Sequence, residues 1–194
     1  MNARALVNHI YLSVASNIDP EENVFQAALQ LAEFCSIRGV SRCFKTAAIP
    51  DPGSSPTISG LPHYINCVVL VQTRYTAPAF KFDVLRPIEA GLGRVRTADK
   101  YANRTIDLDI LLCNDDVVGT PELEIPDPDI TRRWFLMAGI LDIDPDLTLP
   151  LDSQPLRIHF QKLLDQEPGR RLSVTEDPAL KAKIAALVTD VQRA

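Results

Sequence analysis

The sequence predicts an α+β fold with a ferredoxin-like βαββαβ core, in which helices pack on an antiparallel sheet. The main observation behind this prediction is the order of strand-like and helix-like periodicities along the chain. The length of 194 residues agrees with it, because that is enough for one well-buried domain with a small appendage. We therefore expect a core domain at residues 1–150 and, packed on the same domain, a C-terminal helical extension at residues 151–194.

The first three elements follow from the apolar pattern of the N-terminal part. Residues 8–14 are apolar at every second position, as in a half-buried strand. Asp19 and Pro20 suit the N-cap and first turn of a helix, which apolar residues at helical spacing extend to about Cys35. Residues 36–46 then predict a second strand.

A segment rich in proline, glycine and serine, residues 47–62, interrupts this pattern. No regular element survives that composition, and a long loop between two strands of a compact domain favours a lid. The continuous apolar run at residues 64–73 then predicts a central strand. Tyr64 and Asn66 at its start suit stacking on, and hydrogen bonding to, a flat heterocycle, although a plain core role for Tyr64 is equally plausible.

The second half of the chain is expected to supply helices around one further core strand. A helix begins near Thr76 and should kink or restart near Arg86, because Pro87 removes a backbone donor. The segment RTIDLDILL (104–112) predicts the strand, and Asp129 is expected to cap the helix that follows it. Apolar residues at helical spacing predict two last helices near residues 156–164 and 180–191.

The stretch from residue 94 to residue 109 carries the clearest chemistry. Asp107 and Asp109 are two positions apart on the predicted strand, so both side chains point to the same face. Two such carboxylates repel each other unless a cation lies between them, and a divalent metal is the obvious candidate. The cations just upstream suit phosphate groups; they are Arg94, Arg96, Lys100 and Arg104. This stretch therefore predicts a phosphate-transfer site.

Composition excludes several other classes of protein. A net charge of −5 argues against general nucleic-acid binding, and no apolar run is long enough to span a membrane. The N-terminal residues do not resemble a signal peptide, which predicts a cytoplasmic location. The chain also has no Walker A motif and no GxGxxG, so it does not look like a P-loop or Rossmann enzyme.

Several segments together resemble the 6-hydroxymethyl-7,8-dihydropterin pyrophosphokinase family, whose members act in folate synthesis. An aspartate pair alone also recurs in glycosyltransferases and nucleases, so the combination of motifs carries the resemblance. It covers about residues 8–150. The segments are, in order, YLSVASN, FKTAAI, PHYIN, IEAGLGRVR, NRTIDLDILL and IPDPDITRRWFL.

The resemblance implies transfer of a diphosphate group from ATP to the hydroxymethyl oxygen of a reduced pterin, with release of AMP. It implies two Mg2+ ions held by Asp107 and Asp109. The implied catalytic residues are Arg94, Arg104, Asp107 and Asp109. The implied pterin pocket consists of Thr46, Ile49, Tyr64, Asn66 and Phe135, with the ring between Tyr64 and Phe135. The implied ATP-binding residues are Glu89, Arg94, Arg96, Arg104, Ile110 and Arg133.

The chain departs from the family pattern at positions that bear on nucleotide binding and loop closure more than on the metal pair. Asp127 replaces a histidine usual near the nucleotide, where an acidic group should weaken ATP binding unless it faces away. The other departures are Ala15 for a glycine, Arg86 for a glutamine, Tyr101 for a tryptophan and Asn103 for a proline. Asn17 precedes the first helix, and a turn-forming role is its better interpretation.

Three alternatives to this enzyme remain open. The first is a divergent paralogue that acts on another pterin or uses ATP poorly. The second is a non-catalytic module that binds a pterin or nucleotide, and the third is an α+β domain whose charged stretch is merely solvated. The C-terminal residues show no chemistry and either pack on the sheet or form an oligomer contact, so we expect a monomer or a weak homodimer.

Overall fold

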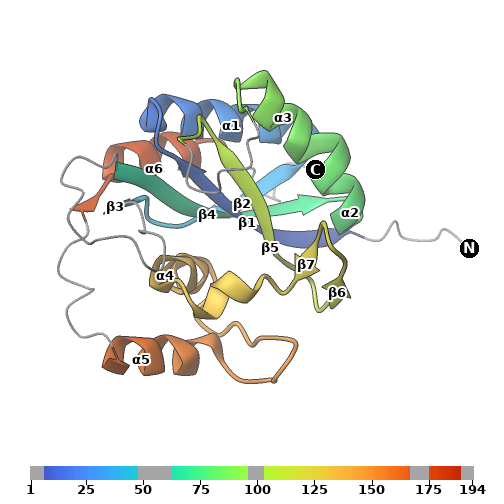
Figure 1. Cartoon of the computed structure of the whole chain (residues 1–194), viewed down its shortest axis with the longest axis vertical. Coiled ribbons are helices and arrows are strands. Elements are labelled where there is room, and N and C mark those ends of the chain that lie inside the picture. The colour runs from blue at the N-terminus through green and yellow to red at the C-terminus, as the bar shows by residue number, and fades with distance from the viewer. Residues whose placement is uncertain (1–6, 48–62, 96–102, 167–174, 189–194) are drawn as a thin grey trace, which may run out of the picture.

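The computed structural model describes residues 7–47, 63–95, 103–166 and 175–188 (Figure 1). The strands are β1 (Asn8–Ser16), β2 (Ser36–Val40), β3 (Phe44–Ala47), β4 (His63–Thr73), β5 (Asp107–Cys113), β6 (Val118–Gly119), β7 (Glu124–Ile125) and β8 (Thr175–Glu176). The helices are α1 (Pro20–Phe34), α2 (Ala77–Ala79), the π-helix η1 (Phe80–Leu85), α3 (Arg86–Gly91), the 3-10 helix η2 (Pro128–Thr131), α4 (Trp134–Ile143), α5 (Leu156–Gln166) and α6 (Pro178–Ala185).

The main sheet has the order β5–β1–β4–β3–β8, with β2 also paired to β4, and every pairing is antiparallel. This arrangement of helices on an antiparallel sheet confirms the predicted fold class. The chain order through β5 is βαβββαβ, which is the predicted βαββαβ with its second strand divided in two. The single strand expected at residues 36–46 is instead two strands. It is interrupted at Ser41, whose side-chain oxygen accepts a hydrogen bond from the backbone N–H of Val68 at 2.8 Å.

Helices cover both faces of the sheet (Figure 1). One face packs against α1, the helix from α2 to α3, and α6. The other face packs against α4, and α5 lies outside α4. Gly139 allows α4 to approach β4 closely, because a Cβ at this position would lie 2.6 Å from Val68 Cγ2. Within the described ranges, no helix combines the length and the apolar character needed to cross a bilayer.

The irregularity expected near Arg86 is confirmed. The helix widens into the π-helix η1, and the N–H of Arg86 donates to the carbonyl of Lys81, five residues earlier. The α-helix restarts at Arg86, so that Pro87 occupies its first turn, where a missing N–H is tolerated.

One predicted helix cap is confirmed and the other is wrong. Asp19 stands at the N-cap of α1 with Pro20 in the first turn, as predicted, although its backbone has a φ of 40° and its side chain makes no capping hydrogen bond. Asp129 caps no helix; Asp127 instead accepts the N–H of Asp129 at 2.7 Å and begins η2, while Arg133 occupies the N-cap of α4.

The C-terminal residues contribute more than the expected helices. The short strand β8 extends the sheet beside β3. Arg42 pairs with Asp142 at 2.9 Å and with Glu176 at 2.8 Å, which joins β8 to α4. The division of the chain at residue 150 stays a prediction, and residues 189–191 of the last predicted helix lie outside the described ranges.

Candidate functional site

The site residues on the strands share one face and one end of the sheet. Leu108 and Ile110 of β5 are buried beneath η1 and α3, so the alternating side chains of Asp107 and Asp109 lie on the opposite face. In β4, Ile65 and Cys67 are buried on the same side as Leu108, which leaves Tyr64 and Asn66 on the side of the aspartates.

Strand register fixes the spacing within this site. Ala15 of β1 is paired with Asn66 on one side and with Asp107 on the other. Neighbouring strands lie about 4.8 Å apart, so the backbones at Asn66 and Asp107 are separated by roughly 10 Å. The predicted pterin side and the predicted metal side of the site are therefore held apart by the width of one strand, with the methyl group of Ala15 between them.

Asp107 lies between two guanidinium groups. Arg94 donates to Oδ1 of Asp107, and Arg104 donates to Oδ2. The three side chains are only 13 to 20% exposed. Burial lowers the pKa of Arg104, but the charge and hydrogen bond of Asp107 outweigh it, so the net pKa is raised. Both predicted catalytic arginines thus converge on the first aspartate.

Asp109 has a different partner, Lys81, which sequence reasoning missed. Nζ of Lys81 lies 3.5 Å from Oδ1 of Asp109, and the Asp109 side chain remains 47% exposed. Removal from water and the charge of Asp107 raise the pKa of Asp109, while Lys81 and Arg94 oppose the shift. No sequence motif marks Lys81, because only the packing of η1 beside β5 brings it to the aspartate.

Glu89 is buried and completes the ion-pair network. One of its carboxylate oxygens accepts a hydrogen bond from Arg94 and another, at 2.9 Å, from the backbone N–H of Leu108. Its position in α3 thereby holds Arg94 against the start of β5. The nucleotide contact implied for Glu89 stays a prediction.

We expect Glu89→Ala to lower the free energy of unfolding by about 3 kcal/mol, because it leaves the buried Arg94 with one carboxylate fewer and the Leu108 N–H without its acceptor. Urea unfolding measures the change. The exposed Glu122, replaced in the same way, should alter stability by less than about 0.5 kcal/mol. A loss below about 1 kcal/mol in Glu89→Ala would mean that Asp107 alone balances Arg94.

Asn17 does more than form a turn, which corrects the preferred interpretation of this residue. Its side-chain oxygen accepts the N–H of Arg104 at 2.7 Å, and its amide donates to Oδ1 of Asn103 at 2.8 Å. Ser16 adds a 2.5 Å hydrogen bond from its hydroxyl to the carbonyl of Thr105. The end of β1 therefore anchors the backbone that carries Arg104.

The described part of the predicted pterin pocket lies on the same face. Asn66 is buried and donates to the Thr46 hydroxyl at 2.9 Å. Tyr64 lies close enough to Arg104 to contribute to the raised pKa of Arg104. Phe135 is buried against Trp134, with ring centroids 5.9 Å apart. Ile49 lies outside the described residues, and the stacking of a ring between Tyr64 and Phe135 stays a prediction.

The remaining predicted ATP-binding residues fall into three cases. Arg133 pairs with Asp129 at 2.7 Å near the start of α4. The side chain of Ile110 is buried in the core, so only its main chain can meet a ligand, at the edge of β5 that faces away from β1. Arg96 lies outside the described residues, as does Tyr101.

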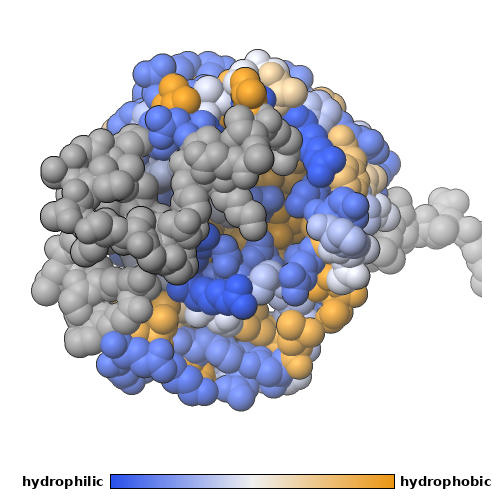
Figure 2. Space-filling model, in the orientation of Figure 1, coloured by the Kyte–Doolittle hydropathy of each residue, from blue (hydrophilic) through white to orange (hydrophobic). Residues whose placement is uncertain are grey.

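Asp127 lies near the site. Its N–H donates to the carbonyl of Leu111 at 2.9 Å, which fastens the segment before η2 to β5. Burial and the charges of Asp129 and Asp109 raise the pKa of Asp127 to about 6, although the hydrogen bond from Asp129 opposes the shift. On the face seen in Figure 2, strongly hydrophilic residues cross the middle, close to the start of α4.

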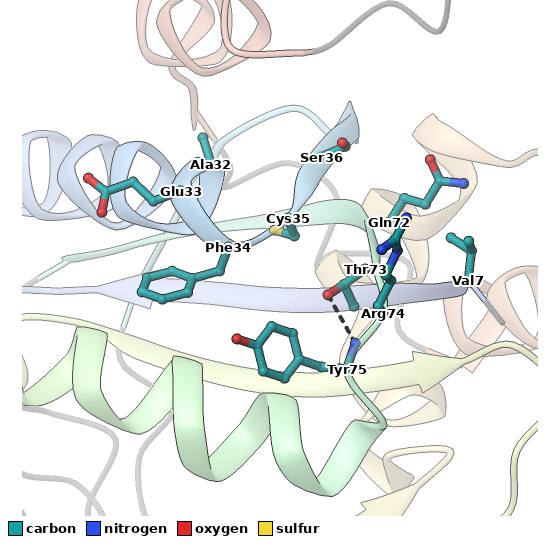
Figure 3. A pocket seen from close by; sticks show the side chains of 10 residues that line it. All are labelled: Val7, Ala32, Glu33, Phe34, Cys35, Ser36, Gln72, Thr73, Arg74 and Tyr75. Atoms are coloured by element: carbon teal, nitrogen blue, oxygen red, sulfur yellow. Dashed lines mark hydrogen bonds between the residues drawn. The ribbon is translucent and has the colours of Figure 1, made fainter. Parts of the chain in front are cut away.

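A separate cavity of about 590 Å³ lies at the opposite end of the sheet (Figure 3). It is bounded by the end of α1, the start of β1 and the turn after β4, and Phe34 and Tyr75 project into it. None of the predicted site residues lines it. The predicted site therefore lies elsewhere than this cavity.

Comparison with known proteins supplies the family context. The profile of a family described as 7,8-dihydro-6-hydroxymethylpterin-pyrophosphokinase (HPPK) matches residues 11–145. The chain is 32% identical over 159 residues to the folic acid synthesis protein fol1 of Pneumocystis carinii, covering 81% of this chain and 20% of that protein. It is 31% identical over 148 residues to a 2-amino-4-hydroxy-6-hydroxymethyldihydropteridine pyrophosphokinase of Pseudomonas aeruginosa, covering 75% and 86% of the two chains.

Solved structures agree on the fold. The Plasmodium falciparum HPPK-DHPS structure with pteroate superimposes with a TM-score of 0.64 at 15% identity, over 88% of this chain and 45% of that one. The chain thus spans about a fifth of the fungal protein and less than half of the Plasmodium protein.

Proposed function

The chain belongs to the 7,8-dihydro-6-hydroxymethylpterin-pyrophosphokinase family, and on that premise we propose that it transfers a diphosphate group from ATP to 6-hydroxymethyl-7,8-dihydropterin. The products would be AMP and the pterin diphosphate used in folate biosynthesis. Both substrates belong to the metabolism of the cell interior, so the proposal includes a cytoplasmic location.

The observation that supports this activity best is the convergence of Arg94 and Arg104 on Asp107. Arginine suits the transferred group, because its planar guanidinium donates two parallel hydrogen bonds to phosphate oxygens. Diphosphate transfer needs little covalent chemistry from the protein, so positioned positive charge supplies most of the rate acceleration. A merely solvated charged face would leave these side chains exposed rather than buried in one network.

The donor set of the site suits Mg2+. Carboxylate oxygens are its preferred protein ligands, and Asp109 is exposed enough to meet an ion. In the described part of the chain, no three acidic, histidine or cysteine side chains cluster in a way that could hold a metal. Asp107 and Asp109 would hold two ions together with oxygens of the substrate phosphates. Bound there, the ions would neutralise phosphate charge and orient the reacting oxygens.

The other site residues would position the two substrates. Asn66, held by Thr46, would read the edge of the pterin, and Tyr64 would stack on it. The separation of roughly 10 Å between Asn66 and Asp107 leaves room for the pterin hydroxymethyl group to reach the phosphates. Arg133 and the main chain of Ile110 would contact the nucleotide, and Glu89 would keep Arg94 in place.

The assay that tests the proposal is incubation with ATP, Mg2+ and 6-hydroxymethyl-7,8-dihydropterin, followed by chromatography of the nucleotides. We expect AMP in step with pterin diphosphate, and no product when Mg2+ is chelated. ADP in place of AMP would contradict diphosphate transfer. Pterin binding by calorimetry without AMP would favour the non-catalytic binding module, and AMP formation with a different pterin only would favour the divergent paralogue.

A further inference from the structure

Lys81 stands out among the charged groups at the site. It belongs to η1, between the buried Phe80 and the exposed Phe82, yet its side chain is only 16% exposed and its ammonium group lies 3.5 Å from Oδ1 of Asp109. The π-helical turn that carries it packs directly beside β5. Wide turns of this kind recur at functional sites in helices.

The ion pairs around the two aspartates are balanced in charge. In the described part of the chain, the cations of this network equal its carboxylates in number: Lys81, Arg94 and Arg104 face Glu89, Asp107 and Asp109. A divalent ion entering alone would therefore add positive charge that these six side chains do not offset. An ion that enters with a triphosphate brings its own compensation.

The three cations are not held equally. Arg94 and Arg104 both hydrogen-bond to the buried Asp107, whereas Lys81 makes a single, longer contact with the more exposed Asp109. An ammonium group on a flexible, well-hydrated stem moves more easily than a guanidinium fixed in a network. Of the three cations, Lys81 is thus the one that yields its carboxylate to a metal most easily.

We propose that Lys81 is a positioning residue that holds Asp109 until metal and ATP arrive together, and so couples the binding of the two. This inference rests on the proposed function, since it takes Asp109 as a metal ligand and ATP as the co-substrate. Without nucleotide, Lys81 competes with the metal for Asp109 and repels it. With nucleotide bound, the released ammonium group is attracted to the triphosphate, so the same side chain then favours the complex.

The test measures metal binding apart from activity. Free Mn2+ is counted by electron paramagnetic resonance during titration of the wild-type protein, Lys81→Met and the charge-matched control Lys162→Met, which changes an exposed residue of α5. We expect Lys81→Met to bind Mn2+ about tenfold more tightly than wild type, within the usual range of coupling between sites. The control should bind as wild type does.

The second half of the test uses α,β-methylene-ATP in the presence of Mg2+, measured by calorimetry. We expect Lys81→Met to bind this analogue several-fold more weakly than wild type. Lys81→Arg should bind both Mn2+ and the analogue as wild type does, because it keeps the charge. If Lys81 only stabilised the fold, Lys81→Met would bind both Mn2+ and the analogue more weakly. Unfolding curves of the variants check that each one is folded.

Two results would overturn the inference, and they differ in whether the proposed metal site falls with it. If Asp109→Asn removes Mn2+ binding but Lys81→Met binds Mn2+ no more tightly than wild type, the coupling role is wrong while the metal site stands. If Asp109→Asn binds Mn2+ as wild type does, Asp109 is not a metal ligand, and that part of the proposed function falls with the inference.

Discussion

Asp107→Ala is expected to abolish AMP formation, lowering kcat by about 10³-fold or more. The substitution removes a carboxylate assigned to the metal, and metal stabilisation of transferred phosphate is worth several kcal/mol. Each 1.4 kcal/mol corresponds to about a factor of ten in rate. It also leaves Arg94 and Arg104 without the carboxylate that both of them contact. The loss of function should therefore be accompanied by a lower free energy of unfolding.

The measurement is the initial rate of AMP release at saturating substrates. Asp115→Ala is the matched control, because Asp115 is exposed in the turn after β5 and should retain the wild-type rate. A rate in Asp107→Ala within about tenfold of wild type would contradict the assignment of this residue to the metal.

Arg104→Ala is expected to lower kcat by about 10³-fold and to change pterin affinity only a few-fold, as for an arginine that stabilises charge on a transferring phosphoryl group. The structure directs Arg104 at Asp107, while Asn66 and Thr46 bond to each other on the far side of Ala15. Loss of Arg104 therefore affects the phosphate side of the site. Steady-state kinetics give kcat, and calorimetry gives the pterin dissociation constant.

The control for Arg104 is Arg157→Ala, which removes a more exposed arginine on α5 that lies 3.6 Å from Asp146. It should leave kcat unchanged. A collapse of pterin affinity in Arg104→Ala would instead place Arg104 in the pterin pocket, a result that its closeness to Tyr64 makes informative.

Local sequence pattern accounts for most of the fold. Apolar alternation located β1 and β5, a continuous apolar run located β4, and helical spacing located α1 and α5, because these patterns report directly which faces of an element are buried. Pro87 predicted the irregular helix, because the missing backbone N–H is a property of the residue itself and needs no tertiary information. The break between β2 and β3 was missed, because it depends on Ser41 bonding to Val68 of a different strand.

In the site, too, some features follow from local sequence and others from the packing of distant elements. The sequence by itself determined that Asp107 and Asp109 share a face of one strand, that arginines precede them, and that the motifs around them are those of the pyrophosphokinase family. Only the tertiary structure decided which cation meets which carboxylate: Arg94 and Arg104 both contact Asp107, Lys81 contacts Asp109, and Asn17 holds the backbone of Arg104. Spacing along one strand is local geometry that the residues carry with them. Pairing between side chains from η1, α3, β1 and β5 depends on how those elements pack, and no single stretch of sequence contains that information.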